Sequence, residues 1–527
     1  MRGNVMAMSR KKVLWVDDEI EFLRSHIMFL ETRGYSVTPV FNGDDALHIL
    51  HEQPEGFDIV LLDEQMPGKD GLTVLEEVKD FLPDLPVVMV TKSEEEQVME
   101  DALGMKIDGY LTKPVNPSQI LSVCKRLLHS RQIISSQVSQ RFVRSFSETR
   151  TALQSPLDAP GYMSIYESLV KWDFELEKVE DEGIRQTHAG QKSDADVQFG
   201  NYYIENYMQW LNDKTDAPVL SPDVLRTYVA PRLKAGERVY LMVFDCMRLD
   251  QFMAVEPLLK KHFNVERHTY CTTIPSSSSY TRAALFGGTD ALDIATRHPD
   301  LWKARDSHES GGGTLEETLL RENLAREGLE LGDALQHSTI RNMADSQEVL
   351  GKVGDWRDKR LVSMDINFVD MLIQSRDTST VIQEIAPDEP AFRRLTHSWF
   401  QYSNVYQVLK ELSRQECTVI LTTSNGSVLC TRGTEIYGDT STDKNLRYRF
   451  GDKITCDERH ALFISEPARF KLPAATPETV GIILKENYYF ILHDKFENYQ
   501  KQYSNTFQHG GISMQEIIVP LAVLTPR

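Results

Sequence analysis

Five short runs rich in Val, Ile and Leu alternate with amphipathic stretches near the start of the chain, and four of them end at a polar or charged side chain. This pattern constrains the fold more than any other feature. The runs predict strands at Val13–Val16, Ser36–Val40, Ile59–Leu62, Val87–Val90 and Gly109–Leu111. Short β-branched runs between amphipathic stretches are typical of a parallel sheet covered by helices. The sequence therefore predicts a doubly wound α/β domain over residues 10–130.

The side chains at the ends of these runs are of the types that bind a metal ion and a phosphoryl group. Asp17 and Asp18 follow the first run and Asp63 follows the third, while Thr91 and Lys113 follow the fourth and fifth. Ligands of open α/β sheets gather at the carboxyl ends of the strands, so these residues should meet. Mg²⁺ takes oxygen ligands, which predicts a site formed by the three aspartates. Taken singly, each residue could instead be a helix cap or a solvated side chain.

Four segments around these residues, VDDE, LLDEQMPG, VTKSE and LTKP, resemble the CheY-like receiver domain of two-component response regulators. The resemblance implies phosphorylation of Asp63 by a sensor histidine kinase and a cis bond between Lys113 and Pro114. It also implies that Thr91 and Tyr110 reposition together, although Tyr110 could simply be a core residue. We expect phosphorylation to remodel the face around the fourth helix and fifth strand and to bias an equilibrium of homodimerisation or domain packing.

The chain length of 527 residues is too great for one hydrophobic core. Residues 131–235 carry apolar side chains at helical spacing, interrupted by Pro, Gly and Ser, which predicts a helical linker or small bundle. From residue 236 to 527 the alternation of strands and helices resumes. We therefore expect a second and larger α/β domain there.

Charge and cysteine usage narrow the classes of function and location. The net charge of −20 disfavours duplex DNA binding, and no helix-turn-helix pattern supports a transcription factor. The six scattered cysteines show no CxxC spacing, so we expect free and mostly buried thiols. No run approaches the roughly 18 apolar residues of a membrane helix, and the basic N-terminus leads into an acidic segment rather than a signal peptide. The expected location is cytoplasmic.

Five segments of the larger domain resemble, in order, a PglZ-type domain of the alkaline phosphatase superfamily. They are VFDCMRLDQF, YCTTIPSSSSYTRAALFGG, DINFVDMLIQS, LTTSNGSV and FQHGGISMQEIIVP. With the receiver in front, nearly the whole chain resembles the PorX-type response regulators, which are associated with type IX secretion. The resemblance implies a phosphodiesterase for short oligonucleotides with two Zn²⁺ ions and a Ser or Thr nucleophile.

Residue by residue, this second resemblance is incomplete. Ser278 falls at the position of the nucleophile, and three zinc-ligand positions are retained as Asp245, Asp370 and His509. Three other ligand positions carry neutral side chains, which are Gln374, Ser424 and Asn425. Neutral amides and hydroxyls are weak zinc ligands. The sequence therefore predicts a degenerate zinc site.

The residues at these positions also admit plain structural interpretations. Asp245 and Asp370 could cap the helices that follow them, and PSSSSY could be a loop before a helix capped by Ser279. His509, which precedes two glycines, could be a turn residue.

Two functions for the larger domain remain open at this point. The first is a binding or regulatory module, with a protein partner or a held oligonucleotide. The alternative is a phosphorylation-controlled zinc phosphodiesterase acting on oligonucleotides, in which Asp365, His397 or His460 replaces a lost ligand. Without a metal pair, Ser278 would lack the charge stabilisation that a nucleophile needs.

Overall fold

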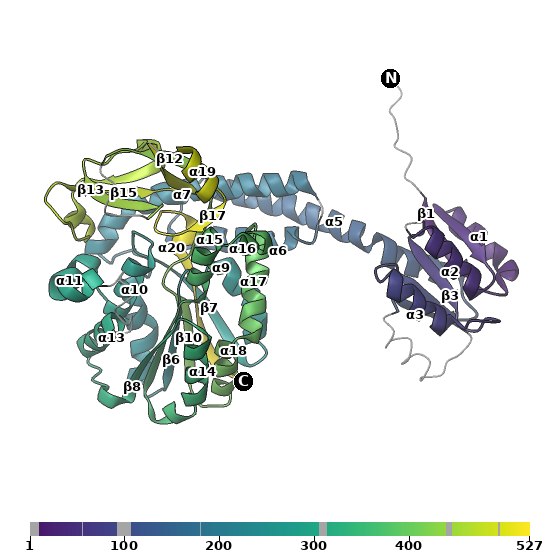
Figure 1. The fold of residues 1–527 in the computed structure, drawn as a ribbon, viewed down its shortest axis with the longest axis horizontal. Helices are drawn as coiled ribbons and strands as arrows, with labels where there is room; N and C mark the ends of the chain where they lie inside the picture. The colour runs from purple at the N-terminus through teal and green to yellow at the C-terminus, as the bar shows by residue number, and fades with distance from the viewer. Residues whose placement is uncertain are drawn as a thin grey trace, which may run out of the picture. The chain divides into compact units, whose positions relative to one another are not determined.

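The chain folds into two compact units, Met1–Arg141 and Phe142–Arg527. The structure is a computed structural model, and Figure 1 shows its ribbon. It describes residues 10–54, 56–91, 107–179, 181–304, 314–438, 445–493 and 496–527.

The smaller unit contains a five-stranded parallel sheet in the order β2-β1-β3-β4-β5. Its strands are β1 (Lys11–Val16), β2 (Tyr35–Val40), β3 (Ile59–Asp63), β4 (Val87–Thr91) and β5 (Gly109–Thr112). Its helices include α1 (Arg24–Glu31), α2 (Gly43–Glu52) and α3 (Gly71–Phe81). Successive residues of β1 point to opposite faces, so Val13 and Trp15 join one hydrophobic core and Leu14 and Val16 join the other. The predicted doubly wound α/β fold is confirmed, with strands up to two residues longer than expected.

The register of these strands brings their carboxyl ends to one edge. Val16 of β1 is paired with Leu62 of β3, so the residues that follow both lie at the same level. Likewise, Thr91 of β4 is paired with Thr112 of β5. The predicted site residues are therefore neighbours because of strand register.

A helical segment follows the receiver sheet. It comprises α5 (Pro117–Leu153), α6 (Ala159–Leu176), α7 (Glu182–Asn212) and, after two short turns, α8 (Ala230–Lys234). Asp158 caps α6 by accepting a hydrogen bond from the Gly161 amide at 2.9 Å. The predicted helical linker is thus present. Within the described residues, no helix combines the length and apolar character needed to cross a membrane.

The larger unit is organised around a six-stranded mixed sheet in the order β7-β18-β10-β6-β9-β8. Its strands are β6 (Val239–Phe244), β7 (Phe263–Cys271), β8 (Leu335–Ile340), β9 (Leu361–Ile366), β10 (Thr418–Thr423) and β18 (Ile518–Pro526). Strands β10, β6, β9 and β8 are parallel, whereas β18 and β7 join by antiparallel pairing. Phe244 of β6 is paired with Ile366 of β9 and Thr423 of β10, so these three strands end at one level.

Helices cover both faces of this sheet (Figure 1). One core contains side chains of α10 (Ser278–Gly287) and α13 (Thr314–Arg326). The other contains side chains of α9 (Leu249–Leu259), α14 (Met343–Lys352), α15 (Phe368–Thr378), α17 (Glu389–Tyr402) and α18 (Asn404–Leu412). The remaining helices are α11 (Ala291–Arg297), α12 (Pro299–Ala304), α16 (Thr380–Ile385), α19 (Phe496–Tyr503) and α20 (Met514–Ile517).

Three small sheets complete the described part of the unit. They are the three-stranded sheet of β13 (Tyr448–Asp452), β15 (Thr479–Leu484) and β14 (Ala461–Ile464), the pair of β12 (Arg432–Ile436) and β16 (Tyr488–Leu492), and the pair of β11 (Val428–Cys430) and β17 (Thr506–Gln508). Antiparallel pairing places Gln508 of β17 opposite Val428 of β11, three residues after Asn425. This pairing brings His509, which follows β17, to the edge where β10 ends.

Buried charges attach helix α6 to the helices that cover the mixed sheet within the larger unit. The Arg393 guanidinium of α17 contacts Glu177, which follows α6, and lies 2.9 Å from Asp250 of α9. Arg248 pairs with the same Asp250 at 2.7 Å. The side chains of Arg248, Asp250 and Arg393 are each less than a tenth exposed, whereas Glu177 is exposed. Such pairs fix geometry more than they stabilise, because removing the charges from water offsets much of their attraction.

Asp196 of α7 makes the linker's contact with α20 sensitive to pH. Its carboxylate accepts a hydrogen bond from the Met514 amide at 2.6 Å, and burial raises its pKa to about 7. A carboxyl group whose pKa is higher in the folded chain contributes stability that is lost as pH rises from its unfolded pKa to its folded pKa. Over pH 5 to 7 this loss amounts to about 2 kcal/mol, since one pKa unit is worth about 1.4 kcal/mol. We expect Asp196→Asn to remove this slope, which urea denaturation followed at several pH values would measure. A slope unchanged by the substitution would contradict the assignment.

Candidate functional site

Lys113 joins two of the predicted aspartates at the edge of the receiver sheet. Its ammonium Nζ lies 2.7 Å from Oδ2 of Asp17 and 2.7 Å from Oδ2 of Asp63. Oxygen atoms of Asp17, Asp18 and Asp63 lie within 4.8 Å of one another. Asp17 and Asp63 are buried, while Asp18 is exposed. The arrangement provides carboxylate oxygens for a hard cation such as Mg²⁺, with one side open to solvent. The Lys113–Pro114 peptide bond is cis, as the resemblance implies.

Burial and pairing act in opposite directions on the charges of this cluster. Burial raises the pKa of the Asp63 carboxyl group, and the hydrogen bond from Lys113 opposes this rise in part. For Lys113, burial alone would lower the pKa, but the hydrogen bonds to Asp17 and Asp63 outweigh it and raise the pKa. The ammonium ion is therefore retained beside Asp63, where it can pair with an anionic group.

Thr91 and Tyr110 lie next to the acidic cluster. The Thr91 hydroxyl donates a hydrogen bond to the carboxylate of Glu64, the residue after Asp63. Tyr110 is half-buried and packs against the receiver core. Burial raises the pKa of its phenol, and the nearby Glu64 carboxylate acts in the same direction. The structure thus brings together the two side chains predicted to move jointly. The expected fourth helix of the receiver falls within residues 92–106, outside the described residues.

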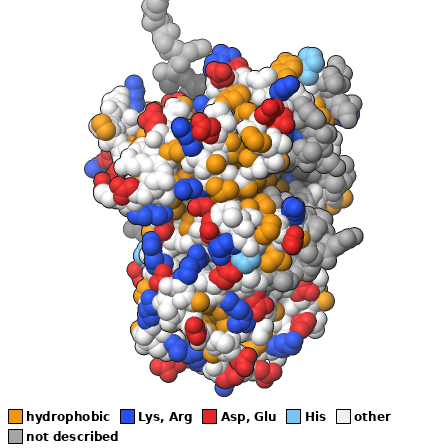
Figure 2. All heavy atoms as spheres, turned by 90° about the vertical axis from the view of Figure 1, so that its left-hand side faces the viewer, with side chains coloured by type: hydrophobic (Ala, Val, Ile, Leu, Met, Phe, Trp, Pro, Cys, Tyr) orange, Lys and Arg blue, Asp and Glu red, His pale blue; other side chains and the backbone are white. Residues whose placement is uncertain are grey.

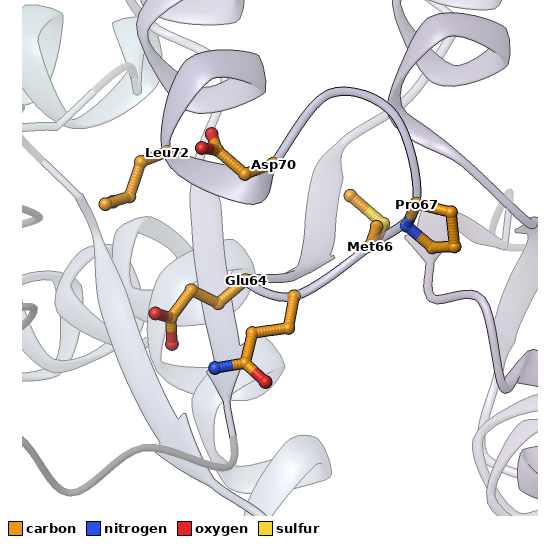
Figure 3. Close-up of a pocket in the computed structure, with 6 residues that line it drawn as sticks. Glu64, Met66, Pro67, Asp70 and Leu72 are labelled. Carbon is orange, nitrogen blue, oxygen red and sulfur yellow. The ribbon is translucent and has the colours of Figure 1, made fainter.

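The loop that follows Asp63 borders an open hollow of about 530 Å³. The hollow is lined by Glu64, Gln65, Met66, Pro67, Asp70 and Leu72. Figure 3 shows Glu64, Asp70 and Leu72 around it, with Met66 and Pro67 at the bend of the loop between β3 and α3. Gln65, Pro67 and Asp70 are exposed, so this loop faces solvent beside Asp63.

In the larger unit, Asp245 and Ser424 meet at the ends of β6 and β10. The Ser424 hydroxyl donates to Oδ1 of Asp245 at 2.6 Å and lies 2.7 Å from Oδ1 of Asn425. Ser278 Oγ donates to the same Asn425 oxygen at 3.0 Å. The structure therefore brings the candidate nucleophile, Ser278, to Asn425, one of the neutral side chains predicted at zinc-ligand positions.

A second group of side chains lies around Asp370. Its Oδ1 is 3.3 Å from His509 Nε2 and 3.5 Å from Cys246 Sγ, and its Oδ2 accepts a hydrogen bond from Gln374 at 2.8 Å. Ligand atoms of Cys246, Asp370 and His509 lie within 4.8 Å of one another. Burial would raise the pKa of Asp370, but the interactions with His509, Cys246 and Arg282 together outweigh it and lower the pKa. Burial raises the pKa of the Cys246 thiol to about 11.

The predicted capping roles around these residues are wrong in detail. Arg248 rather than Asp245 occupies the N-cap position of α9, and α15 begins after Asn367, so Asp370 lies within its first turn. Ser277 rather than Ser279 precedes α10. The side chains of Asp245 and Asp370 are therefore directed to the site instead of to helix ends.

Arg282 pairs with Asp245, one of the side chains predicted at a zinc-ligand position. Its guanidinium hydrogen bonds to Asp245, lies 2.9 Å from Glu316 and is 3.6 Å from Asp365. All three carboxylates are less than a tenth exposed. Burial raises the pKa of Asp365 to about 8, while Arg282 opposes this rise. One fixed cation thus neutralises a buried acidic cluster.

Two side chains of this site were missed by sequence reasoning. Cys246 was expected to be an ordinary buried thiol, although it directly follows the strand-end residue Asp245. Arg282 is four residues after Ser278 on α10, and that spacing places both on one helix face.

Of the proposed replacement ligands, Asp365 is the one that contacts this site, through Arg282. The His460 ring stacks on Tyr488 with centroids 3.9 Å apart, and its Nδ1 lies 3.1 Å from the Thr434 hydroxyl. Among the described residues, neither His397 nor His460 belongs to the cluster around Asp370.

Comparison with family models finds three matches along the chain. The response regulator receiver domain matches residues 13–125, and the PorX response regulator linker domain matches residues 132–211. The BREX system PglZ alkaline phosphatase-like domain matches residues 224–524, which is more than half of the chain.

Comparison with individual proteins finds matches to the receiver. The transcriptional regulatory protein BaeR of Escherichia coli O6:H1 is 35% identical over 119 residues, which are 22% of this chain and 48% of BaeR. The transcriptional regulatory protein ResD of Bacillus subtilis is 33% identical over 117 residues, which are 22% of this chain and 48% of ResD. The chain thus spans about half the length of these curated relatives.

A similar solved structure is the CheY-like response regulator receiver domain protein from Methanospirillum hungatei. It is 30% identical and has a TM-score of 0.22, with 23% of this chain and 96% of that chain covered.

Proposed function

Since this chain belongs to the PglZ alkaline phosphatase-like family and carries a response regulator receiver domain and a PorX linker domain ahead of it, we propose that it is a response regulator switched by phosphorylation on Asp63. The contact of Lys113 with both Asp17 and Asp63, beside Asp18, carries this proposal. A receiver that accepts a phosphoryl group needs a nucleophilic carboxylate, a metal site and a fixed cation in one place.

The chemistry assigned to this site is phosphoryl transfer from a phosphohistidine of a sensor histidine kinase. A carboxylate oxygen of Asp63 forms the new P–O bond as the P–N bond to histidine breaks. Asp17, Asp18 and Asp63 would hold Mg²⁺, which supplies charge neutralisation to the phosphoryl oxygens when bound. Lys113, already hydrogen bonded to Asp63, is positioned to pair with a phosphoryl oxygen.

The switch is assigned to Thr91 and Tyr110. In the structure the Thr91 hydroxyl is hydrogen bonded to Glu64, so a phosphoryl group on Asp63 would compete with Glu64 for this donor. Movement of Thr91 toward Asp63 frees space near Tyr110 and biases an existing equilibrium of homodimerisation or packing of the two units.

The larger unit is assigned the role of a binding or regulatory module with a reduced metal centre. The supporting observation is Arg282, whose guanidinium pairs with Asp245 where a second Zn²⁺ would need that carboxylate. Intermixed acidic and basic side chains on the face seen in Figure 2 do not form the basic band that duplex DNA requires. The second candidate is a phosphodiesterase that acts on oligonucleotides with one metal ion. It is favoured by the position of the candidate nucleophile, because Ser278 Oγ lies 3.7 Å from Sγ of Cys246, which belongs to the group around Asp370.

Labelling with acetyl phosphate and Mg²⁺ tests the receiver proposal. We expect one phosphoryl group per chain in the unchanged protein and none in Asp63→Asn, because the amide cannot act as the nucleophile. Asp58→Asn is the matched control, since Asp58 pairs with Lys11 away from the cluster. Intact-mass spectrometry counts the label, and sedimentation of the same samples reports any dimer. Equal labelling of Asp63→Asn and the unchanged protein would exclude Asp63 as the acceptor.

A further inference from the structure

Three side chains from distant parts of the larger unit form a compact set of ligand atoms. Cys246 follows β6, Asp370 lies in the first turn of α15, and His509 follows β17. Their ligand atoms lie within 4.8 Å of one another, and Cys246 and Asp370 are buried. Thiolate, carboxylate and imidazole are the three protein ligands that Zn²⁺ prefers. We propose that Cys246, Asp370 and His509 hold one Zn²⁺ ion, with the Cys246 thiolate supplying a third protein ligand. This inference deepens the reduced metal centre proposed above and rests on that assignment.

The backbone at Cys246 supports a specialised role for this thiol. Its φ angle of 62° is left-handed, a conformation that is unfavourable for a residue other than glycine. The conformation turns the chain between β6 and the start of α9. It places Sγ 3.5 Å from Asp370 Oδ1 and 3.4 Å from Asn425 Nδ2. A buried thiol that only filled space would not need to face a carboxylate and an imidazole.

Neighbouring side chains hold these ligands in position. Gln374, exposed on α15, donates to Oδ2 of Asp370, leaving Oδ1 directed at Cys246 and His509. Polar partners of this kind orient metal ligands and strengthen binding. In the part of the chain that the structure describes, His509 Nδ1 is buried without a hydrogen-bond partner. The other ring nitrogen, Nε2, faces Asp370 Oδ1 at 3.3 Å, so Nε2 is the atom positioned to bind a metal ion beside Asp370 and Cys246.

The contacts of Asp245 explain why we expect one Zn²⁺ ion per chain rather than two. Asp245 is engaged by Arg282 and by the Ser424 hydroxyl, so a second ion would have to displace a guanidinium from three buried carboxylates. Three protein ligands leave a tetrahedral Zn²⁺ with one open position. Ser278 lies beside it, so the fourth ligand is the Ser278 hydroxyl, water or an anionic oxygen.

Cobalt titration of the full-length protein tests this site without relying on activity. Co²⁺ is added to metal-free protein in excess Mg²⁺, which occupies the oxygen-only receiver site. We expect one Co²⁺ per chain, with the near-ultraviolet charge-transfer absorption of a thiolate–cobalt bond. Elemental analysis after dialysis against Zn²⁺ should likewise give one Zn²⁺ per chain.

Variants assign the ligand atoms. We expect Cys246→Ser to abolish the charge-transfer band and to weaken Co²⁺ binding by about 100-fold or more. This loss exceeds the usual effect of removing a side chain that only orients a metal ligand. His509→Gln should weaken binding comparably while leaving a weak thiolate band at high Co²⁺. Cys124→Ser, a buried cysteine in the other unit, is the control and should bind normally.

Two results would overturn the site. One is binding without a thiolate band, and the other is equal affinity in the Cys246→Ser variant and the unchanged protein. Phosphoryl labelling of Asp63 does not involve these ligands. If the unchanged protein binds cobalt but is not phosphorylated on Asp63, the receiver proposal alone is rejected. If it binds two Co²⁺ ions per chain, the reduced metal centre is rejected.

Discussion

Replacing Arg282 by Met is expected to lower the free energy of unfolding by about 3–5 kcal/mol, the usual cost of removing one partner from a buried charged group. The substitution leaves Asp245, Asp365 and Glu316 buried without their shared cation. Met preserves much of the apolar stem of the side chain, so the loss reports charge rather than volume. Urea denaturation followed by tryptophan fluorescence at pH 7 would measure it.

Arg297→Met is the matched control for this experiment. Arg297 also pairs with two carboxylates, Asp293 and Glu322, but all three side chains are about one-third exposed or more. Solvent-exposed pairs contribute about 0–1 kcal/mol, so little change is expected. If Arg282 stands in for a metal ion, Zn²⁺ should restore part of the stability of Arg282→Met by binding the folded state. Equal small losses for both variants would contradict the neutralising role of Arg282.

The receiver site could be predicted from sequence because its residues all follow strands of one parallel sheet. Strand order and register are enough to bring Asp17, Asp63, Thr91 and Lys113 to one edge. Local hydrophobic patterning predicts each strand, and parallel pairing places the residues after the strands at the same edge of the sheet. The contact between Thr91 and Glu64 was not predicted, because it depends on side-chain rotamers rather than on periodicity.

The site of the larger unit could be predicted only in part. The ends of β6 and β10 follow from strand patterning, which accounts for Asp245 and Ser424. His509 reaches the site through the pairing of β17 with β11, two three-residue strands whose short sequences carry little signal. Cys246 and Arg282 acquire their roles from partners more than 30 residues away, which no local pattern encodes.

The buried pair of Arg447 and Glu516 also lies beyond local prediction, and it holds the turn that carries His509. Both side chains are fully buried, with Arg447 Nη2 2.7 Å from Glu516 Oε2. Glu516 additionally accepts hydrogen bonds from the Gly511 amide at 2.8 Å and the Ser513 hydroxyl at 2.6 Å. A Cβ at Gly511 would approach the Arg447 guanidinium to 2.1 Å, so the turn packs directly on this cation.

We therefore expect Glu516→Gln to lower the free energy of unfolding by about 3–5 kcal/mol, because an amide of the same shape leaves Arg447 as a buried, uncompensated charge. Urea denaturation at pH 7 measures the loss. Asp457→Asn makes the same chemical change in the exposed pair with Arg459, whose side chain is 83% exposed, and should cost less than about 1 kcal/mol. If the two substitutions cost the same, the Arg447–Glu516 pair does not hold the His509 turn, and other contacts, such as the hydrogen bonds of Ser276 with the Gly510 amide and the Gly511 carbonyl, must position it.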